Sequence, residues 1–207
     1  MKSKRSYSSK RRTDAAESTK RRVLEAARGL FSRSGIDAIT VADIAKRSKV
    51  AESTVYALYK SKVGILRALM MQAIFGARYR AASLRLEETT DPVALLRLTA
   101  GVARAIYEGE TAEIGLLRGS SAFSPELRKL EREFEDTRFE LQRRRVEMLF
   151  ERSLARAGLT LEAARRLLWM YTSRDVYRML VTEGGWTPHE FERWLANTLV
   201  EALARPR

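Results

Sequence analysis

The chain has 207 residues, of which 45% are hydrophobic, carries a formal net charge of +13 and contains no cysteine. The lack of cysteine excludes disulfides, thiolate nucleophiles and cysteine-based metal sites, and no apolar stretch reaches the roughly eighteen residues that a transmembrane helix needs. The length suffices for two domains, and we expect a cytoplasmic protein that uses no membrane and no cofactor.

Residues 1–16 lack an apolar periodic pattern and are rich in serine, lysine and arginine. They predict a basic flexible arm. No apolar stretch follows the charges, which argues against a secretory signal. Two roles are compatible with such an arm: contact with DNA phosphates or the minor groove, and a disordered tail that touches nothing.

Residues 17–34 form the first predicted helix. Its apolar side chains recur three and four residues apart and therefore share one side: Val23, Leu24, Ala27, Leu30 and Phe31. Gly35 follows at the position where a left-handed residue commonly ends a helix.

Two short helices joined by a tight turn are predicted next. The first opens at Thr40, because its hydroxyl and the Asp43 carboxylate have the spacing of a capping box. The second begins near Glu52, and its outer face carries hydrogen-bonding side chains: Ser53, Thr54, Tyr56 and Lys60. A short strand at residues 36–41 is the alternative, but no partner strand with period-two alternation follows it. The pattern favours a helix-turn-helix.

Positive charge is concentrated at the start of the chain. Residues 1–62 hold 16 basic and 6 acidic residues, so +10 of the total charge of +13 lies there. Such a field attracts DNA and makes binding depend on salt. The charge by itself is also compatible with solubility or with attraction to acidic membranes, but its coincidence with a helix-turn-helix favours nucleic acid.

These residues resemble the N-terminal domain of the TetR family of transcriptional regulators. The resemblance runs from Arg22 to Leu66 and is carried by Ala26-Ala27, Leu30-Phe31, Gly35, Thr40-Val41, Ile44-Ala45, Val50, Thr54-Val55-Tyr56, Tyr59 and Lys62. Two positions depart from the family pattern, since Lys49 stands where the family usually has glycine and Ala51 where it usually has a polar cap. Each departure costs about 1 kcal/mol.

The resemblance implies a set of DNA contacts within a domain at residues 17–65. Tyr56 and Lys62 stand where the family contacts phosphate, and the start of the second short helix is where base edges are read. The candidate DNA-binding residues are Thr40, Lys49, Glu52, Ser53, Thr54, Tyr56, Lys60 and Lys62.

Residues 66–207 predict a second, all-helical domain. Proline and glycine positions divide the chain into helices over residues 62–83, 92–107, 125–157 and 161–183, with Gly158 ending the third of these. Thr187 and Glu190 form a further capping box that opens the last helix. The fold class is therefore all-α.

The last two helices have wide apolar stripes, more than one small core needs: Leu167, Leu168, Tyr171, Val176, Met179, Leu180, Trp194, Leu195, Leu199 and Leu203. The resemblance implies that these helices pair with their symmetry mates. The result is a homodimer that binds double-stranded DNA at an inverted repeat. The alternative is a monomer with a richer core.

The second domain also carries aromatic and sulfur-containing side chains suited to a small hydrophobic effector, which the family typically binds there. The candidate ligand-binding residues are Met71, Phe75, Tyr107, Trp169, Met170, Arg174 and Tyr177. Two alternatives stay open, since such residues also build plain cores, and Arg174 with Asp175 also suits a dimer contact.

Nothing in the sequence indicates an enzyme or a metal site. His189 is the only histidine and lies in a capping box, and no glycine-rich phosphate loop is present. Arg143–Arg145 is interpreted as a solvated face. The sequence predicts a transcriptional regulator, in this family most often a repressor, released from DNA by a ligand. The alternatives are a ligand-independent regulator and a DNA-organising protein.

Overall fold

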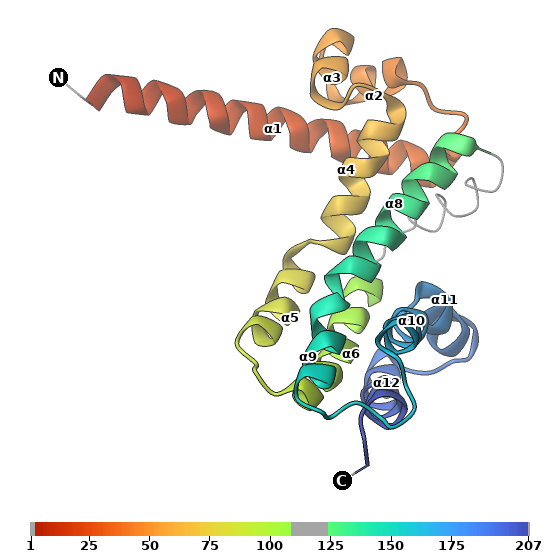
Figure 1. The fold of residues 1–207 in the computed structure, drawn as a ribbon. Helices are drawn as coiled ribbons and strands as arrows, with labels where there is room; N and C mark the ends of the chain where they lie inside the picture. Colours follow the sequence, from red (N-terminus) through yellow and green to blue (C-terminus); the bar gives the residue numbers. More distant parts are fainter. Residues whose placement is uncertain (1–2, 109–123, 207) are drawn as a thin grey trace. The chain divides into compact units, whose positions relative to one another are not determined.

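The computed structural model describes residues 3–108 and 124–206, and within these ranges the chain is helical, with one isolated β-bridge between Ala155 and Ala204 and no strand (Figure 1). The described residues form two compact units: the first contains residues 3–72 and 124–131, and the second contains residues 73–108 and 132–206. An all-helical chain with an N-terminal helix-turn-helix is confirmed.

The helices follow one another along the chain as α1 (Ser3–Ser34), α2 (Val41–Ser48), α3 (Glu52–Tyr59), α4 (Lys62–Ile74), α5 (Ala77–Glu87), α6 (Pro92–Glu108), α8 (Pro125–Leu141), α9 (Arg143–Glu151), α10 (Leu161–Tyr171), α11 (Arg174–Tyr177), the π-helix η1 (Arg178–Glu183) and α12 (Pro188–Leu203).

α1 is longer than the sequence predicts. The helix begins at Ser3 and passes through residues 3–16, where a flexible arm is expected. These residues contain neither glycine nor proline, so nothing in them stops the helix from continuing toward the N-terminus. The predicted end of the helix is confirmed, since Gly35 has a φ of +76° and its amide donates to the Phe31 carbonyl at 2.9 Å.

α2 and α3 have the predicted start signals. The Asp43 amide donates to Thr40 Oγ1 at 3.2 Å and the Thr40 amide donates to Asp43 Oδ2 at 2.9 Å, which confirms the capping box. The Thr40 hydroxyl, at 2.6 Å, and the Thr40 amide both donate to the Asp43 carboxylate, and these two hydrogen bonds lower the pKa of that carboxyl. Lys49 adopts the left-handed conformation, with a φ of +55°, and Ala51 caps α3 without a side-chain hydrogen bond.

The core of the first unit joins its helices through fully buried apolar side chains. Residues with at most 1% exposure are Val23, Ala27, Phe31, Ile44, Val55, Ile65, Leu66 and Leu130. α3 contributes only Val55 to this set. The outer surface of α3 is therefore not packed against the rest of the unit.

The core of the second unit is built on α12, which packs against α6 and α10. Phe191, Leu195, Leu199 and Leu203 of α12 are all 0% exposed. The wide apolar stripe of the last helix is thus largely buried in the chain's own core. Leu195 and Leu199 are core residues, and a surplus that needs a second subunit cannot be argued from them.

Three helices predicted as continuous are interrupted. The stretch 62–83 divides at Gly76, the stretch 125–157 divides at Gln142 and ends at Glu151, and the stretch 161–183 divides at Thr172 and Ser173. Gly76 has an extended backbone and caps α5, whereas Gln142 and Thr172 are buried polar residues. Gly158 has a φ of +82°, but it lies in the loop after α9.

The strained turn at Lys49 generates a stability prediction. Lys49→Gly is expected to raise the free energy of unfolding by up to about 1 kcal/mol, because glycine adopts positive φ without a Cβ clash. Lys46→Gly is the matched control, since Lys46 is helical and its replacement is expected to lower stability by about 0.5–1 kcal/mol. Urea unfolding followed by circular dichroism measures both. A loss of stability in Lys49→Gly contradicts the strain at this turn.

Candidate functional site

The exposed surface of α3 is the first candidate site. Glu52, Ser53 and Thr54 are exposed on its first turn, and Tyr56 is 45% exposed. These are four of the predicted DNA-binding residues, and one short helix brings them together. The hydroxyl and phenol groups on this surface can donate to phosphates and can donate to or accept from base edges, and the Glu52 carboxylate can accept from base edges.

Two polar contacts fix the position of α3. Tyr59 at its C-terminal end donates from its hydroxyl to the Lys20 carbonyl of α1 at 3.2 Å. Burial, together with the nearby Glu17 carboxylate, raises the pKa of the Tyr59 hydroxyl. Lys62 donates from Nζ to the Ile36 carbonyl at 2.8 Å and to the Asp37 carbonyl at 3.3 Å. The Lys62 ammonium is thereby tied to the turn between α1 and α2, which leaves one N–H for a phosphate.

The remaining DNA-binding candidates lie at helix ends. Lys49 and Lys60 are exposed C-terminal caps of α2 and α3, with φ values of +55° and +67°. Thr40 is exposed, but its hydroxyl donates to the Asp43 carboxylate at 2.6 Å. Lys46 and Arg47, which the sequence analysis did not single out, are also exposed on the last turn of α2.

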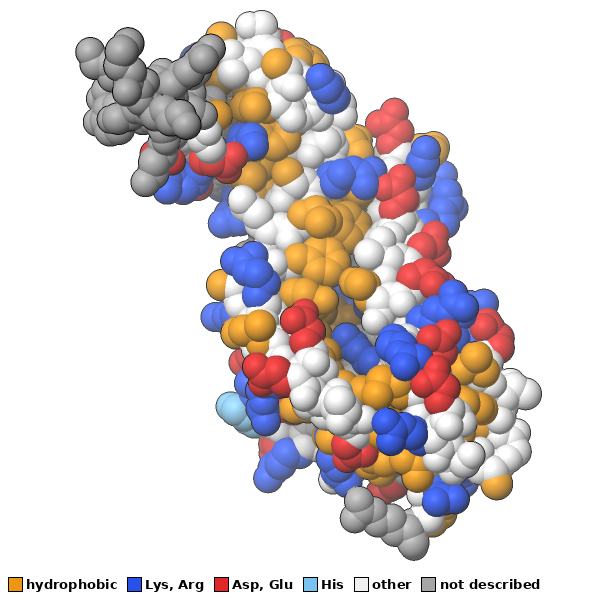
Figure 2. All heavy atoms as spheres, turned by 60° about the vertical axis from the view of Figure 1, so that its left-hand side comes forward, with side chains coloured by type: hydrophobic (Ala, Val, Ile, Leu, Met, Phe, Trp, Pro, Cys, Tyr) orange, Lys and Arg blue, Asp and Glu red, His pale blue; other side chains and the backbone are white. Residues whose placement is uncertain are grey.

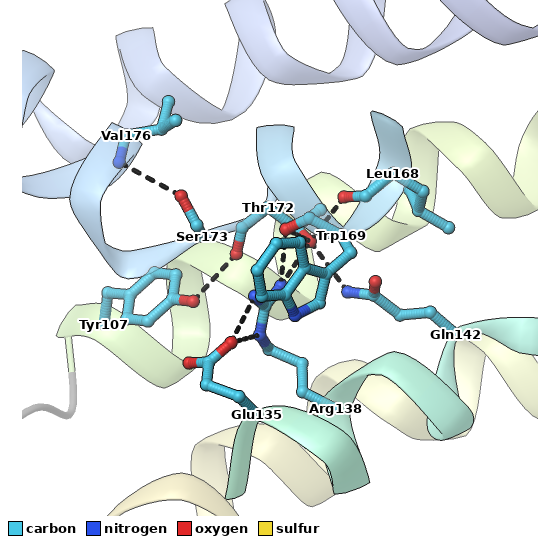
Figure 3. Close-up of polar contacts among 9 residues, drawn as sticks. All are labelled: Tyr107, Glu135, Arg138, Gln142, Leu168, Trp169, Thr172, Ser173 and Val176. Atoms are coloured by element: carbon cyan, nitrogen blue, oxygen red, sulfur yellow. Dashed lines mark hydrogen bonds and ion pairs between the residues drawn. The ribbon is translucent and has the colours of Figure 1, made fainter. Parts of the chain in front are cut away.

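Tyr107 and Tyr177, two of the predicted ligand-binding residues, belong to the core of the second unit. Their ring centroids lie 5.3 Å apart, and Tyr177 also meets Phe191 edge-to-face at 4.9 Å. The Tyr107 hydroxyl donates to the Thr172 carbonyl at 2.8 Å (Figure 3). Both tyrosines have structural contacts in the core, and a contact of either with a ligand stays a prediction.

A polar network surrounds Thr172 at the end of α10. Arg138 donates from one guanidinium nitrogen to Thr172 Oγ1 at 3.0 Å and to the Trp169 carbonyl at 2.7 Å (Figure 3). Its other terminal nitrogen pairs with Glu135 at 2.6 Å, and Gln142 Nε2 donates to Thr172 Oγ1 at 2.7 Å. These contacts explain why polar residues are buried at two of the helix breaks.

Two atoms of this network are buried without a hydrogen bond. They are the indole Nε1 of Trp169 and the amide Oε1 of Gln142, which have no partner in the described part of the chain. One is a donor and the other is an acceptor. A ligand that forms a hydrogen bond with a buried polar atom lacking a partner gains more binding free energy than a ligand that meets an atom already hydrogen-bonded.

The other predicted ligand residues are dispersed. Met170 is 43% exposed on α10, and Arg174 is partly buried at the start of α11. Phe75 packs edge-to-face against Tyr79, with ring centroids 5.0 Å apart. Met71 belongs to the first unit, where it is 47% exposed. Its grouping with the second-unit residues stays a prediction.

The interpretation of Arg143–Arg145 as a solvated face is wrong for one of the three. Arg143 and Arg144 are exposed and pair with carboxylates of α9, Arg143 with Glu147 at 2.7 Å and Arg144 with Glu151. Arg145 points the other way and is partly buried, and this burial lowers the pKa of its guanidinium. Consecutive residues on a helix lie about 100° apart, so a run of three cannot share one face.

The described residues hold no group of three or more histidine, cysteine, aspartate or glutamate side chains able to bind a metal ion. His189 is exposed on the first turn of α12, where it meets Arg104 at 2.6 Å. None of the helices in the described ranges is both long and apolar enough to span a membrane.

Residues 23–69 match the family model described as bacterial regulatory proteins of the tetR family. The match covers α2 and α3 and confirms the resemblance inferred from the sequence. A search of curated proteins finds no match.

Solved structures similar to this chain include a putative TetR-family transcriptional regulator from Syntrophomonas wolfei, with a TM-score of 0.74 and 16% identity over 90% of this chain and 95% of that one. The regulator FadR from Bacillus subtilis in complex with stearoyl-CoA gives 0.68 and 18% over 87% and 97%. A putative regulator from Saccharomonospora viridis in complex with choline gives 0.64 and 15% over 90% and 98%. These likenesses show the fold.

The core assignment of Tyr107 generates the second prediction. Tyr107→Phe removes the donor to the buried Thr172 carbonyl and is expected to lower the free energy of unfolding by about 1–2 kcal/mol. Tyr171→Phe is the matched control, because no hydrogen bond of the Tyr171 hydroxyl occurs in the described ranges. Denaturation followed by tryptophan fluorescence reports on this unit, which holds all three tryptophans. Equal effects of the two variants contradict a structural role for the Tyr107 hydroxyl.

Proposed function

We propose that this chain, whose residues 23–69 form a DNA-binding domain of the TetR family, is a sequence-specific transcriptional regulator. In this proposal it acts as a homodimeric repressor that binds an inverted-repeat operator and leaves it when a small molecule binds the second unit. A ligand-independent regulator and a DNA-organising protein without a specific site are the alternatives that the experiments below separate.

One observation carries the DNA-binding role. The exposed surface of α3 presents three polar side chains in a row, Glu52 to Thr54, while Val55 is buried behind them. A helix held by its inner face and polar on its outer face suits insertion into the major groove, whose width admits a helix. Lys49 and Lys60 at the ends of α2 and α3 supply cations for the adjacent phosphates.

The charge distribution supports the same role. Residues 1–62 carry +10 of the chain's +13, so the part with the helix-turn-helix is the basic one. Neutralised phosphates release counterions, and each contact changes the log–log salt dependence of binding by about −0.9. Affinity is therefore expected to fall steeply between low and physiological salt.

The division between reading and positioning contacts gives the third prediction. Ser53→Ala is expected to change the preferred DNA sequence, because its exposed hydroxyl stands on the first turn of α3. Tyr56→Phe removes a phosphate donor and is expected to weaken all sequences alike, by about tenfold or less. Binding-site selection followed by titration measures both effects.

The control for this experiment is Ser32→Ala, an exposed serine on α1 whose hydroxyl already donates to the Arg28 carbonyl at 2.9 Å. It is expected to leave motif and affinity unchanged. An unchanged motif in Ser53→Ala together with an altered motif in Tyr56→Phe reverses the proposed roles. Lys62→Ala does not test phosphate contact cleanly, because it also removes the hydrogen bonds that Lys62 donates to the carbonyls of the turn before α2.

Dimerisation is proposed through α10 and α12. A large apolar side chain stays uncovered on α10, with Met170 43% exposed. A two-fold axis relating two copies places two α3 helices in successive major grooves when they lie about 34–36 Å apart. Inverted repeats in DNA mirror that symmetry.

The fourth prediction follows from this surface. The protein is expected to sediment as a dimer at micromolar concentration, and Met170→Asp to weaken the dimer by placing a carboxylate in an apolar contact. Leu84→Asp, at a 57% exposed position on α5, is the control and is expected to stay dimeric. If the wild-type protein sediments as a monomer both in the absence and in the presence of DNA, the proposed dimer is contradicted.

Two observations support effector binding in the second unit. Trp169 Nε1 and Gln142 Oε1 are buried without a hydrogen-bond partner among the described residues. Similar folds bind small molecules, since the FadR structure contains stearoyl-CoA and the Saccharomonospora viridis structure contains choline. A ligand lowers DNA affinity only by as much as it prefers the DNA-free conformation.

The fifth prediction tests this release. Small apolar compounds that raise the melting temperature are expected to weaken operator binding by about 5- to 150-fold. Trp169→Phe removes the indole N–H and is expected to weaken such compounds while ligand-free DNA binding is retained. Trp186→Phe is the control, because Trp186 Nε1 is not among the unpartnered buried atoms of the described residues. Compounds that stabilise the protein without changing operator affinity indicate a ligand-independent regulator.

A further inference from the structure

The most unusual charge in the second unit is Arg145 of α9. Its only hydrogen bond within the described ranges runs from a terminal guanidinium nitrogen to Thr99 Oγ1 on α6, at a long 3.4 Å. Thr99 is itself 1% exposed and donates to the Leu95 carbonyl at 2.7 Å. No carboxylate lies within ion-pair distance of Arg145 in the part of the chain that the structure describes.

Neighbouring arginines differ in this respect. Arg143 pairs with Glu147, Arg144 pairs with Glu151, and Arg138 pairs with Glu135 at 2.6 Å. Burying a charge without a counterion is strongly unfavourable, which is why buried arginines are almost always paired. The partial burial of Arg145 without a carboxylate among the described residues leaves room for a counterion supplied by a bound molecule.

One residue of α5, Tyr79, is near Arg145. Tyr79 lies within electrostatic range of the Arg145 guanidinium, and Phe75 packs edge-to-face on Tyr79. Ser83 follows Tyr79 by one helical turn on the same side, and its hydroxyl is buried with no hydrogen-bond partner among the described residues. The face of α5 that carries Tyr79 thus also carries an unsatisfied hydroxyl.

α5 is only loosely covered. It packs against α6, yet none of its residues is fully buried, and Leu84 is 57% exposed. On the face drawn in Figure 2, hydrophobic side chains gather around a hollow that has lysine or arginine side chains at its lower edge. Apolar walls with cations at one edge suit a molecule with an apolar chain and a negative head.

We propose that the second unit binds an anionic amphiphile whose carboxylate or phosphate head pairs with Arg145 between α5, α6 and α9, and whose apolar chain lies along Phe75 and Tyr79. Ser83 supplies a hydroxyl to the same head. The inference rests on the proposed function, in which the second unit is the effector domain, and names the ligand class: an acid rather than a neutral or cationic compound.

The test uses the full-length protein and four ligands with the same apolar chain, each below its aggregation concentration. They are dodecanoate, dodecyl phosphate, 1-dodecanol and dodecylamine, whose affinities are measured by isothermal titration calorimetry. At least one of the two anions is expected to bind about tenfold or more tightly than dodecanol, because a charge-assisted hydrogen bond forms only with the anions. Dodecylamine is expected to bind weakest. The carboxylate and phosphate arms identify the preferred head.

Arg145→Met is expected to remove the preference for the anion to within about twofold and to leave dodecanol binding unchanged. Its melting temperature is expected to equal or exceed that of the wild type, since a partly buried charge without a counterion is removed. Arg144→Met, at the exposed neighbour that pairs with Glu151, is the control and is expected to keep the full preference.

Two results of the calorimetry overturn the inference: wild-type protein that binds dodecanol as tightly as both anions, and Arg145→Met that folds and keeps the anion preference. If Arg145→Met does not fold, Arg145→Lys decides, because it retains the charge but loses the planar fork and is expected to keep a reduced preference. An operator-binding assay separates this inference from the proposed release. If the anions bind more tightly than dodecanol but leave DNA affinity unchanged, only the proposed release from DNA is overturned. If dodecanol releases DNA as readily as the anions do, only the proposal of an anionic ligand is overturned.

Discussion

The position of α3 depends on very few contacts. Val55 is its only buried side chain, and beyond it Tyr59 binds the α1 backbone while Lys62, just after the helix, binds the turn before α2. An eight-residue helix is not stable alone in water. The polar outer surface of α3 therefore exists as a defined shape only because the surrounding unit holds it. Because so little of α3 is needed for packing, most of its surface is available for a partner.

Lys49 and Arg145 depart from local preference, and both lie at candidate sites. Lys49 takes a left-handed conformation that favours glycine, and it adds a cation near α3. Arg145 places a cation inside the second unit without a carboxylate in the described ranges. Natural sequences depart from local rules mainly at functional sites, where the departure has a use. The stability lost at these two positions is consistent with one contact to phosphate and one to an acidic ligand.

Local signals were predictable from the sequence, and tertiary ones were not. The capping boxes opened by Thr40 and Thr187 follow from spacing alone, because both partners lie within four residues. The break at Gln142 depends on Thr172, thirty residues away, which no local pattern reveals. The apolar stripe that contains Leu195 predicted that one face of α12 is buried. It could not show whether the same chain or a second copy buries that face. Arg145 was misread because its run of three arginines crosses two faces of α9.

The central claim is that the chain reads a specific DNA sequence, and one ratio tests it most directly. The measurement compares the affinity for an inverted repeat selected from genomic fragments with the affinity for random DNA of equal length, at one fixed physiological salt concentration. The account predicts a ratio of about 10³ or more, the range of sequence-specific regulators. A ratio near one, with binding governed by salt alone, would contradict it and identify a DNA-organising protein.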